Sequence, residues 1–286
     1  MPELPEVETI VRDLRREVLG KTLSNFLVFD RKISWPRLAL PLKIKEVARH
    51  GKYIVCGAGR GVNCLVHLRM TGELLLGQQS ENINRQKHER ARFIFSDGSH
   101  LRFLDQRRFG TVEWLEGGSA LPSLGLDPLS SEFTAKNFYR ALQSSSRAVK
   151  SLLLDQKAVS GIGNIYADES LWMAKIHPRR KSGKISLKEA EVLRDVIRAV
   201  LRKAIKKGGF TLRDYRRVDG RLGEYQNSRK AYDREGEDCL PRALRFRSGQ
   251  AGSRGLRCGA KIKKIKIGGR SSYFCPKCQK QRENRK

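Results

Sequence analysis

The chain of 286 residues is long enough for two compact domains, each with its own hydrophobic core. It holds 59 Lys and Arg residues against 30 Asp and Glu, and this net charge of +29 predicts a polyanionic partner, which could be DNA, RNA or an anionic membrane. A disordered basic tail protein is disfavoured, because 39% of the residues are hydrophobic. The amino terminus lacks the features of a signal peptide and no apolar run reaches membrane-spanning length, so we expect a cytoplasmic protein without membrane contact.

The start of the chain predicts a short amphipathic helix that is ended by Gly20. Pro2 and Pro5 lie before or within its first turn, where proline is tolerated. From about residue 21 to 116 apolar residues alternate as they do in strands, and Asp97-Gly98 separates two such strands as a hairpin turn would. The first part of the chain is therefore expected to be rich in β-structure. The apolar face of the helix consists of Val7, Ile10, Val11, Leu14 and Val18.

A loop-like stretch, residues 117–132, separates this region from mainly helical patterns. The strongest helical pattern begins at a Ser186/Glu189 capping box and ends at Gly208-Gly209. Shorter helices are predicted around residues 134–144, 147–155 and 163–175.

Residues 210–238 are polar, contain glycine and show no clear period, so a surface loop is expected there. Residues 240–286 form the most basic part of the chain, with fifteen Lys and Arg residues and one acid, Glu283. We expect this end to face phosphates. Cys56 and Cys64 lie in strand patterns and are expected to be small buried residues.

The other four cysteines predict a metal site. Cys275 and Cys278 form a CxxC pair that can grip one tetrahedral zinc ion from a tight turn. The usual second CxxC is missing, but Cys239 can supply a ligand if residues 240–257, rich in Arg, Gly and Ser, form an insertion before Cys258. We predict one structural zinc ion; the alternative is that the first two cysteines are ordinary thiols and no metal binds. The predicted ligands are Cys239, Cys258, Cys275 and Cys278.

Three separated stretches then point to one family. They are MPELPEVET at the start, QKAVSGIGNIYADESL from Gln156 to Leu171, and CGAKIKKIKIGGRSSYFCPKCQ at the end. Together they closely resemble bacterial formamidopyrimidine-DNA glycosylases, of the Fpg/Nei family, over essentially the whole chain.

The resemblance implies an α+β fold with DNA bound in a cleft between domains. Residues 1–125 would form a β-sandwich domain with an N-terminal helix, 126–235 a helical domain with a helix-two-turn-helix and a lesion loop, and 236–286 a zinc finger with its insertion. The implied activity is that of a bifunctional DNA glycosylase and abasic-site lyase of base excision repair, which excises oxidised purines such as 8-oxoguanine and formamidopyrimidines. Its partner would be double-stranded DNA with oxidised bases or abasic sites, and we expect a monomer associated with the nucleoid.

The resemblance also assigns catalytic residues. Removal of Met1 would leave Pro2 as a free amino terminus, and an α-amine is appreciably neutral at physiological pH, so it can attack C1′ of a deoxyribose and form an iminium. Glu3 would protonate the opening sugar, while Glu6 would orient the amine or a water, although carboxylates near a helix start are also simply stabilising. Lys52 would act between nucleobase recognition and phosphate contact.

Chemistry on a base requires its removal from the stack, and the hole left behind must be filled. The resemblance assigns this filling role to Met70, Arg107 and Phe109, with the guanidinium pairing to the widowed base. The remaining expected DNA contacts are made by Lys52, His88, Lys157, Asn164 and Arg270.

Two alternatives remain open. An endonuclease VIII-like enzyme would use the same amine on oxidised pyrimidines; the LPEVE opening and the long loop over 210–238, which could close over a purine, favour the formamidopyrimidine type. A non-catalytic zinc-ribbon protein would bind DNA through charge alone and would form no covalent adduct.

Overall fold

The computed structural model of the chain describes residues 1–35, 40–78, 84–116, 119–240 and 258–281. The chain forms two compact units, and its path alternates between them. The first unit comprises residues 1–122 and 204–227, and the second comprises residues 123–203 and 228–286.

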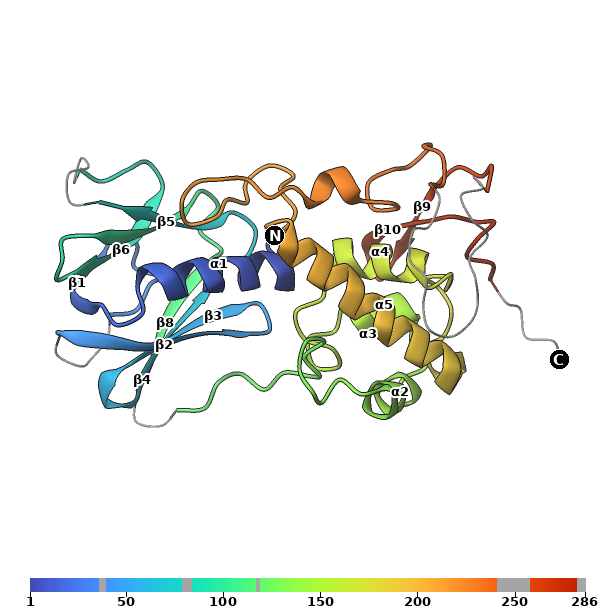
Figure 1. Cartoon of the computed structure of the whole chain (residues 1–286), viewed down its shortest axis with the longest axis horizontal. Coiled ribbons are helices and arrows are strands. Elements are labelled where there is room, and N and C mark those ends of the chain that lie inside the picture. The colour runs from blue at the N-terminus through green and yellow to red at the C-terminus, as the bar shows by residue number, and fades with distance from the viewer. Residues whose placement is uncertain (36–39, 79–83, 117–118, 241–257, 282–286) are drawn as a thin grey trace. The chain divides into compact units, whose positions relative to one another are not determined.

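The first unit contains a β-sandwich (Figure 1). Its eight strands follow the order β5-β7-β6-β1-β2-β3-β4-β8, and every neighbouring pair is antiparallel. β1 and β2 are paired only near Thr22 and Leu23, so the sheet folds there into two layers of four strands. The strands are β1 Thr22–Val28, β2 Leu42–His50, β3 Tyr53–Ala58, β4 Val62–His67, β5 Gly72–Gly77, β6 Glu89–Phe95, β7 His100–Asp105 and β8 Thr111–Leu115, with a 3-10 turn η1 at Gly59–Gly61.

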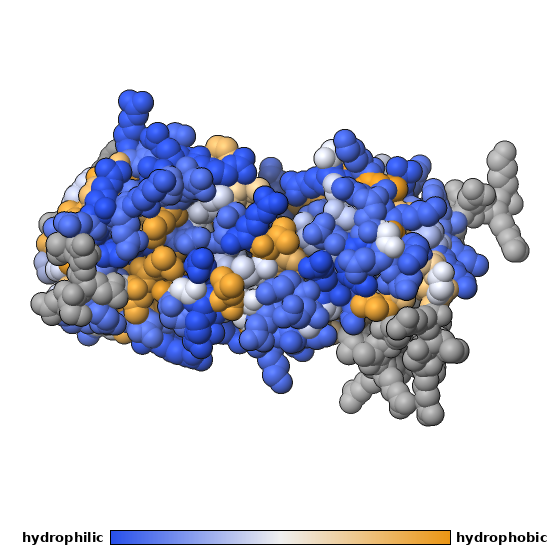
Figure 2. Space-filling model, turned by 90° about the horizontal axis from the view of Figure 1, so that it is seen from above, coloured by the Kyte–Doolittle hydropathy of each residue, from blue (hydrophilic) through white to orange (hydrophobic). Residues whose placement is uncertain are grey.

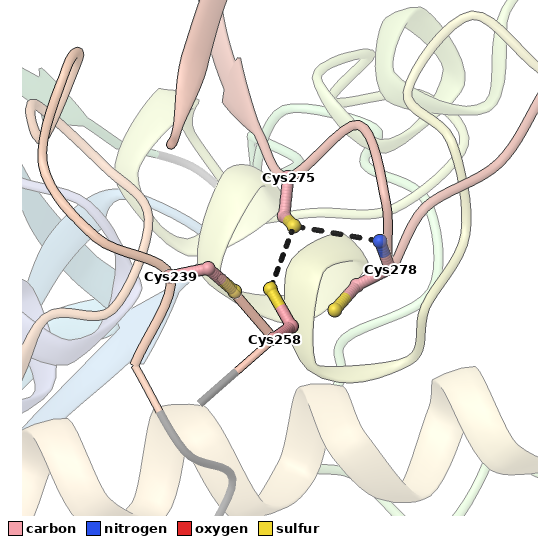
Figure 3. Close-up of side chains that lie close together, drawn as sticks. All are labelled: Cys239, Cys258, Cys275 and Cys278. Atoms are coloured by element: carbon pink, nitrogen blue, oxygen red, sulfur yellow. Dashed lines mark hydrogen bonds between the residues drawn. The ribbon is translucent and has the colours of Figure 1, made fainter. Parts of the chain in front are cut away.

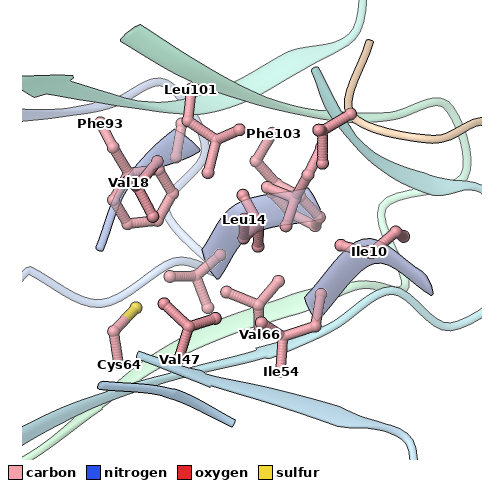
Figure 4. Packing of buried hydrophobic residues seen from close by; sticks show 14 of the residues in the cluster. Ile10, Leu14, Val18, Val47, Ile54, Cys64, Val66, Phe93, Leu101 and Phe103 are labelled. Atoms are coloured by element: carbon pink, nitrogen blue, oxygen red, sulfur yellow. The ribbon is translucent and has the colours of Figure 1, made fainter. Parts of the chain in front are cut away.

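Helix α1 (Leu4–Glu17) lies between the two layers (Figure 4). Its predicted apolar face is buried and shares one core with side chains from both layers, such as Phe103 and Val66. Burial on both sides explains why the first helix carries apolar residues over a wide arc. Because α1 packs in the core along its length, it also fixes the backbone of the residues that directly precede it, Pro2 and Glu3.

The predicted hairpin at Asp97-Gly98 is confirmed. Gly98 has a φ of +80°, and the Phe95 amide donates to the Ser99 carbonyl at 2.9 Å. The alternation of apolar residues predicted over 21–116 is interrupted after β4, which ends at His67, and Met70 lies in the turn before β5.

The expectation of a surface loop over residues 210–238 is wrong in part. The segment has no helix or strand apart from the 3-10 turn η3 (Tyr225–Ser228), but Tyr215 and Val218 belong to the core of the first unit. The Leu76 amide donates to the Val218 carbonyl at 2.8 Å, which adds this segment to the edge strand β5. Residues 210–238 show no hydrophobic period because only a few of them are buried, and these are not regularly spaced.

The second unit is helical, and its helices fall where they were predicted. The long helix α5 begins at the predicted capping box: the Glu189 amide donates to Ser186 Oγ at 3.3 Å, and the Ser186 amide donates to Glu189 Oε2 at 3.0 Å. The helices are α2 Ala135–Gln143, α3 Val149–Leu153, α4 Asn164–Met173, α5 Leu187–Lys206 and the 3-10 turn η2 Ser182–Lys184.

A two-stranded hairpin completes the second unit. β9 (Lys263–Ile267) and β10 (Arg270–Phe274) pair antiparallel, and the two residues between them, Gly268 and Gly269, both have positive φ. Such a two-residue turn requires this conformation, which glycine adopts without strain. The turn therefore presents Arg270 at the tip of the hairpin.

Candidate functional site

The start of the chain is fixed by the first turn of α1. Pro2 is buried, whereas Met1 before it is 43% exposed. The Glu3 amide donates to Glu6 Oε2 at 2.8 Å, which is one half of a capping box. The backbone that carries Pro2 is thus held by the helix that follows it.

Both carboxylate oxygens of Glu6 accept backbone hydrogen bonds. Oε2 takes the Glu3 amide and Oε1 takes the Phe210 amide at 2.8 Å. Gly209, with a φ of +86°, lies so close that a Cβ there would come within 2.9 Å of Glu6 Oε1. Glu6 therefore connects α1 to the segment after α5, so the structure gives this carboxylate a structural role.

Lys52 and His67 lie close together and both are buried. Lys52 occupies the turn between β2 and β3, and His67 ends β4. Burial, together with the positive charges of Arg69 and Lys52, lowers the pKa of His67 to about 4, so its imidazole is neutral at physiological pH. Since the Arg69 amide donates to Nδ1 at 3.0 Å, the imidazole proton lies on Nε2.

His67 is a candidate site residue that the sequence patterns missed. The signal was present: a histidine at the end of a strand, three residues before Met70 and within reach of a buried lysine. Strand alternation alone could not separate it from an ordinary core position.

A cavity of about 520 Å³ opens at the start of the chain in the first unit. Met70 and Phe109 line it and are 41% and 50% exposed, so neither side chain belongs to a hydrophobic core. Arg107 is also exposed, with its guanidinium carbon 4.7 Å from the centre of the Phe109 ring. The residues that line the cavity include Met1, Lys32, Arg69, Met70, Arg108 and Phe109.

His88 lies in the turn before β6. It is half-buried, has a φ of +68°, and its carbonyl accepts the Asp105 amide at 3.0 Å. Its backbone therefore supports the end of β7, from which the loop with Arg107 and Phe109 departs.

In the second unit, Lys157 and Asn164 flank a loop that is braced from within. The Gln156 side chain accepts the Gly161 amide at 2.8 Å and donates to the Ile162 carbonyl at 2.9 Å. Gly161 has a φ of +81°, as the tight turn required. Lys157 is exposed on this loop, and Asn164 is the first residue of α4.

The hairpin that presents Arg270 is anchored by a buried ion pair. Lys150 Nζ lies 2.7 Å from Asp168 Oδ1 and donates to the Ser271 carbonyl at 2.7 Å. Asp168 also accepts the Tyr273 amide at 3.0 Å. Burial raises the pKa of Asp168, and the neighbouring ammonium opposes this shift. Sequence patterns gave no sign of this pair, because each residue reads as an ordinary helix-surface charge.

Four cysteines converge beside this hairpin (Figure 3). The sulfur atoms of Cys239, Cys258, Cys275 and Cys278 all lie within 4.8 Å of one another, and those of Cys258 and Cys275 are 3.6 Å apart. Tetrahedral zinc with bonds of about 2.3 Å places its sulfur ligands roughly 3.8 Å apart. The cluster therefore fits one structural zinc ion.

Cys239 reaches the cluster through backbone pairing on either side of the insertion 240–257, of which residues 241–257 lie outside the described residues. The Cys239 amide donates to the Ala260 carbonyl at 2.9 Å, and the Ile262 amide donates to the Glu237 carbonyl at 2.9 Å. These backbone bonds pair residues 237–239 with residues 260–262, so Cys239 lies close to Cys258 although the two are far apart in sequence. Trp172 of α4 donates its indole N–H to Cys239 Sγ at 3.3 Å, a contact that orients the sulfur.

Cys56 and Cys64 lie apart from this cluster, in the core of the first unit. They are cross-strand neighbours on β3 and β4. Burial raises the pKa of Cys56 to about 12 and holds the pKa of Cys64 well above its usual value. Cys64 is buried, as predicted, whereas Cys56 is partly buried against the same core.

Figure 2 shows one face of the molecule, on which hydrophilic residues dominate and hydrophobic ones occur in small groups. Among the residues that the structure describes, no helix combines the length and the apolar character needed to cross a membrane.

Three family models match the chain. The formamidopyrimidine-DNA glycosylase N-terminal domain matches residues 1–112, the formamidopyrimidine-DNA glycosylase H2TH domain matches 124–216, and a zinc finger found in FPG and IleRS matches 256–281. The last match begins after Cys239, so the structure supplies the fourth cysteine that the family model does not reach.

Individual relatives cover the whole chain. The formamidopyrimidine-DNA glycosylase of Synechocystis is 38% identical, over 99% of this chain and 100% of its own. The crystal structure of the MutM (Fpg) protein from Thermus thermophilus superposes with a TM-score of 0.83 at 37% identity, covering 99% of this chain and 100% of the other. The structure of a Lactococcus lactis Fpg mutant in complex with Fapy-dG-containing DNA superposes with a TM-score of 0.82 at 34% identity. The match covers 98% of this chain and 100% of the other.

A β-sandwich with a buried N-terminal helix, a helix-two-turn-helix unit and a four-cysteine finger together define a DNA glycosylase architecture. Identity above 30% over nearly the whole length then settles the family. The chain belongs to the formamidopyrimidine-DNA glycosylase family.

Proposed function

We propose that this protein is a bifunctional DNA glycosylase and abasic-site lyase that excises oxidised purines, with Pro2 as its nucleophile. The observation that carries the proposal is the cavity at the start of the chain. Met1 lines it together with Met70 and Phe109, so loss of Met1 would leave the Pro2 nitrogen as the terminus at this cavity. The family membership, the Fapy-dG complex of the Lactococcus relative and the net charge of +29 support the same activity.

The proposed reaction begins when the lone pair of the Pro2 nitrogen attacks C1′ of the extruded nucleotide. The bond from C1′ to the base breaks, and the base leaves with the bonding electrons and takes up a proton. Glu3 then protonates O4′, the sugar ring opens, and the nitrogen becomes an iminium. This electron sink acidifies the C2′ proton, whose loss expels the 3′ phosphate, and a second elimination expels the 5′ phosphate.

In this proposal Glu6 holds the α1 start that carries the nucleophile, because its carboxylate is bonded to the Glu3 and Phe210 amides. Met70 and Phe109 would occupy the space left by the extruded nucleotide, and Arg107 would pair with the base opposite. The remaining contacts with the nucleotide and the phosphates would be made by Lys52, His88, Lys157, Asn164 and Arg270.

The zinc ion, when bound, cross-links the ends of the finger and supplies no reaction chemistry. Cys239, Cys258, Cys275 and Cys278 would hold it. We further propose that the protein acts as a monomer on nucleoid DNA in the cytoplasm, since its charge favours a polyanion and its chemistry needs no second subunit.

Borohydride reduction of a reaction with duplex DNA containing 8-oxoguanine tests the proposal. A covalent adduct is expected, and peptide mass spectrometry should place it on the Pro2 nitrogen. Pro2→Gly should suppress base excision while DNA binding persists, whereas Pro5→Ala, which alters the same helix turn without touching the terminal amine, should remain active. An adduct on another residue, or strand cleavage without any adduct, would refute the mechanism, and faster excision of thymine glycol would refute the purine preference.

A further inference from the structure

The loop after β7, residues 105–110, is tied down by two buried carboxylates, although its side chains at Arg107 and Phe109 are exposed. We propose that Asp105 and Asp30 are positioning residues, which hold this loop in its DNA-entering shape before DNA arrives. The inference rests on the proposed function, because it takes Arg107 and Phe109 as the residues that enter the duplex.

Asp105 gathers three donors onto one carboxylate. It is fully buried, its Oδ1 accepts the Thr71 hydroxyl and the Arg107 amide, and its Oδ2 accepts the Gly110 amide at 2.7 Å. The Arg107 amide also lies 3.2 Å from Thr71 Oγ1. Both ends of the exposed turn are thereby bonded to the residue that ends β7.

Gly110 shows how closely the loop lies on this carboxylate. A Cβ at this position would come within 2.6 Å of Phe103 Cζ and 3.1 Å of Asp105 Oδ2. Only glycine fits at that distance without displacing the buried ring. The close contact between the loop at Gly110 and the Asp105 carboxylate therefore depends on the absence of a side chain at residue 110.

Asp30 holds the middle of the loop. Its carboxylate accepts Arg108 Nε at 2.6 Å and Arg108 Nη2 at 2.9 Å, a bidentate pair, and the guanidinium lowers the pKa of Asp30 to about 2. Arg108 has a φ of +59°, which is unusual for arginine and so needs a compensating interaction. Of two consecutive arginines, one is bound to the protein and the other, Arg107, remains beside Phe109.

Arg90 connects the main chain of Asp105 to the carboxylate of Asp30. Its Nε donates to the Asp105 carbonyl at 2.8 Å and lies 3.9 Å from Asp30 Oδ2. An exposed loop without such bonds would sample many shapes and would lose that freedom on binding. Fixing the loop in advance removes this cost and fixes the geometry with which Arg107 meets the opposite base.

The test measures discrimination between opposite bases. The rate of excision of 8-oxoguanine is measured opposite cytosine and opposite adenine, and each variant's rates are normalised to its own cleavage of abasic DNA. Thr71→Val removes one donor to Asp105, and we expect it to reduce the ratio of the two rates by about five- to tenfold. Thr71→Ser keeps the hydroxyl and should keep the wild-type ratio.

A double-mutant cycle separates positioning from general stability. Thr71→Val should change the ratio in the wild-type background but not when Arg107→Ala is already present, because the loop then has no base-reading side chain to position. A ratio that Thr71→Val leaves unchanged, or changes equally in both backgrounds, overturns this inference. Failure of the wild-type protein to excise the lesion at all overturns the proposed function instead, and the positioning role falls with it.

Discussion

Replacement of Glu6 by glutamine should destabilise the first unit. The buried carboxylate accepts the Glu3 and Phe210 amides, each at 2.8 Å. A glutamine side chain has one carbonyl oxygen, so it can accept one of these two bonds, and its NH2 group must then face the other backbone donor. A hydrogen bond to a charged group contributes about 1.5–3 kcal/mol, and the surviving bond loses its charge, so we expect Glu6→Gln to cost about 3 kcal/mol of unfolding free energy.

Urea unfolding followed by tryptophan fluorescence measures this effect, because Trp35 and Trp114 belong to the first unit and Trp172 to the second. Glu17→Gln is the matched control: Glu17 is exposed near the end of the same helix, so its unfolding free energy should change by less than about 0.5 kcal/mol. Equal urea midpoints for Glu6→Gln and the wild type would show that the two bonds do not hold the helix start. Activity of the variant must be compared well below its unfolding temperature, so that lost structure is not taken for lost chemistry.

Three further predictions concern the zinc cluster and the loop carboxylates. Trp172→Phe removes the N–H donated to Cys239 Sγ and should release zinc to a chromogenic chelator severalfold faster than the wild type; equal release would show that the contact does not support the site. Cys239→Ser should hold less than one zinc per chain, and an unchanged stoichiometry would remove Cys239 from the ligand set. Asp30→Asn should lower the free energy of unfolding by about 1–2 kcal/mol at pH 7. This value is reduced to allow for the solvent exposure of Arg108. Because the pKa of Asp30 falls from 3.8 to about 2 on folding, this stabilisation is present above about pH 4.5 and is lost toward pH 2, so melting curves of variant and wild type should converge in acid; a constant difference would contradict the assignment.

Local signals in the sequence were sufficient for most of the elements. The Ser186/Glu189 box and the Gly98 turn are read from a few neighbouring residues, because caps and tight turns are decided by local backbone geometry. The cysteine cluster was also predictable from spacing and from the composition of residues 240–257, although the pairing beside Ala260 that brings Cys239 to the other cysteines was not.

Contacts between distant segments could not be predicted. Tyr215 and Val218 enter the core from a polar stretch without a period, and only the β-sandwich around them makes them buried. Asp30 and Asp105 read as ordinary loop and strand-end acids, yet each is buried against a partner at least 30 residues away in sequence, such as Arg108 or Thr71. Such pairings depend on register and topology, which composition does not encode.

Because residues 204–227 complete the first unit, protein synthesis must pass through the whole intervening segment before that unit can close. A ribosome has already delivered residues 1–122 when Phe210, the donor to Glu6, has yet to be made. The bond from Phe210 to Glu6, which holds the start of α1, therefore forms late in translation. A fragment that ends after residue 122 but before residue 227 therefore lacks part of the first unit, although it contains all of residues 1–122.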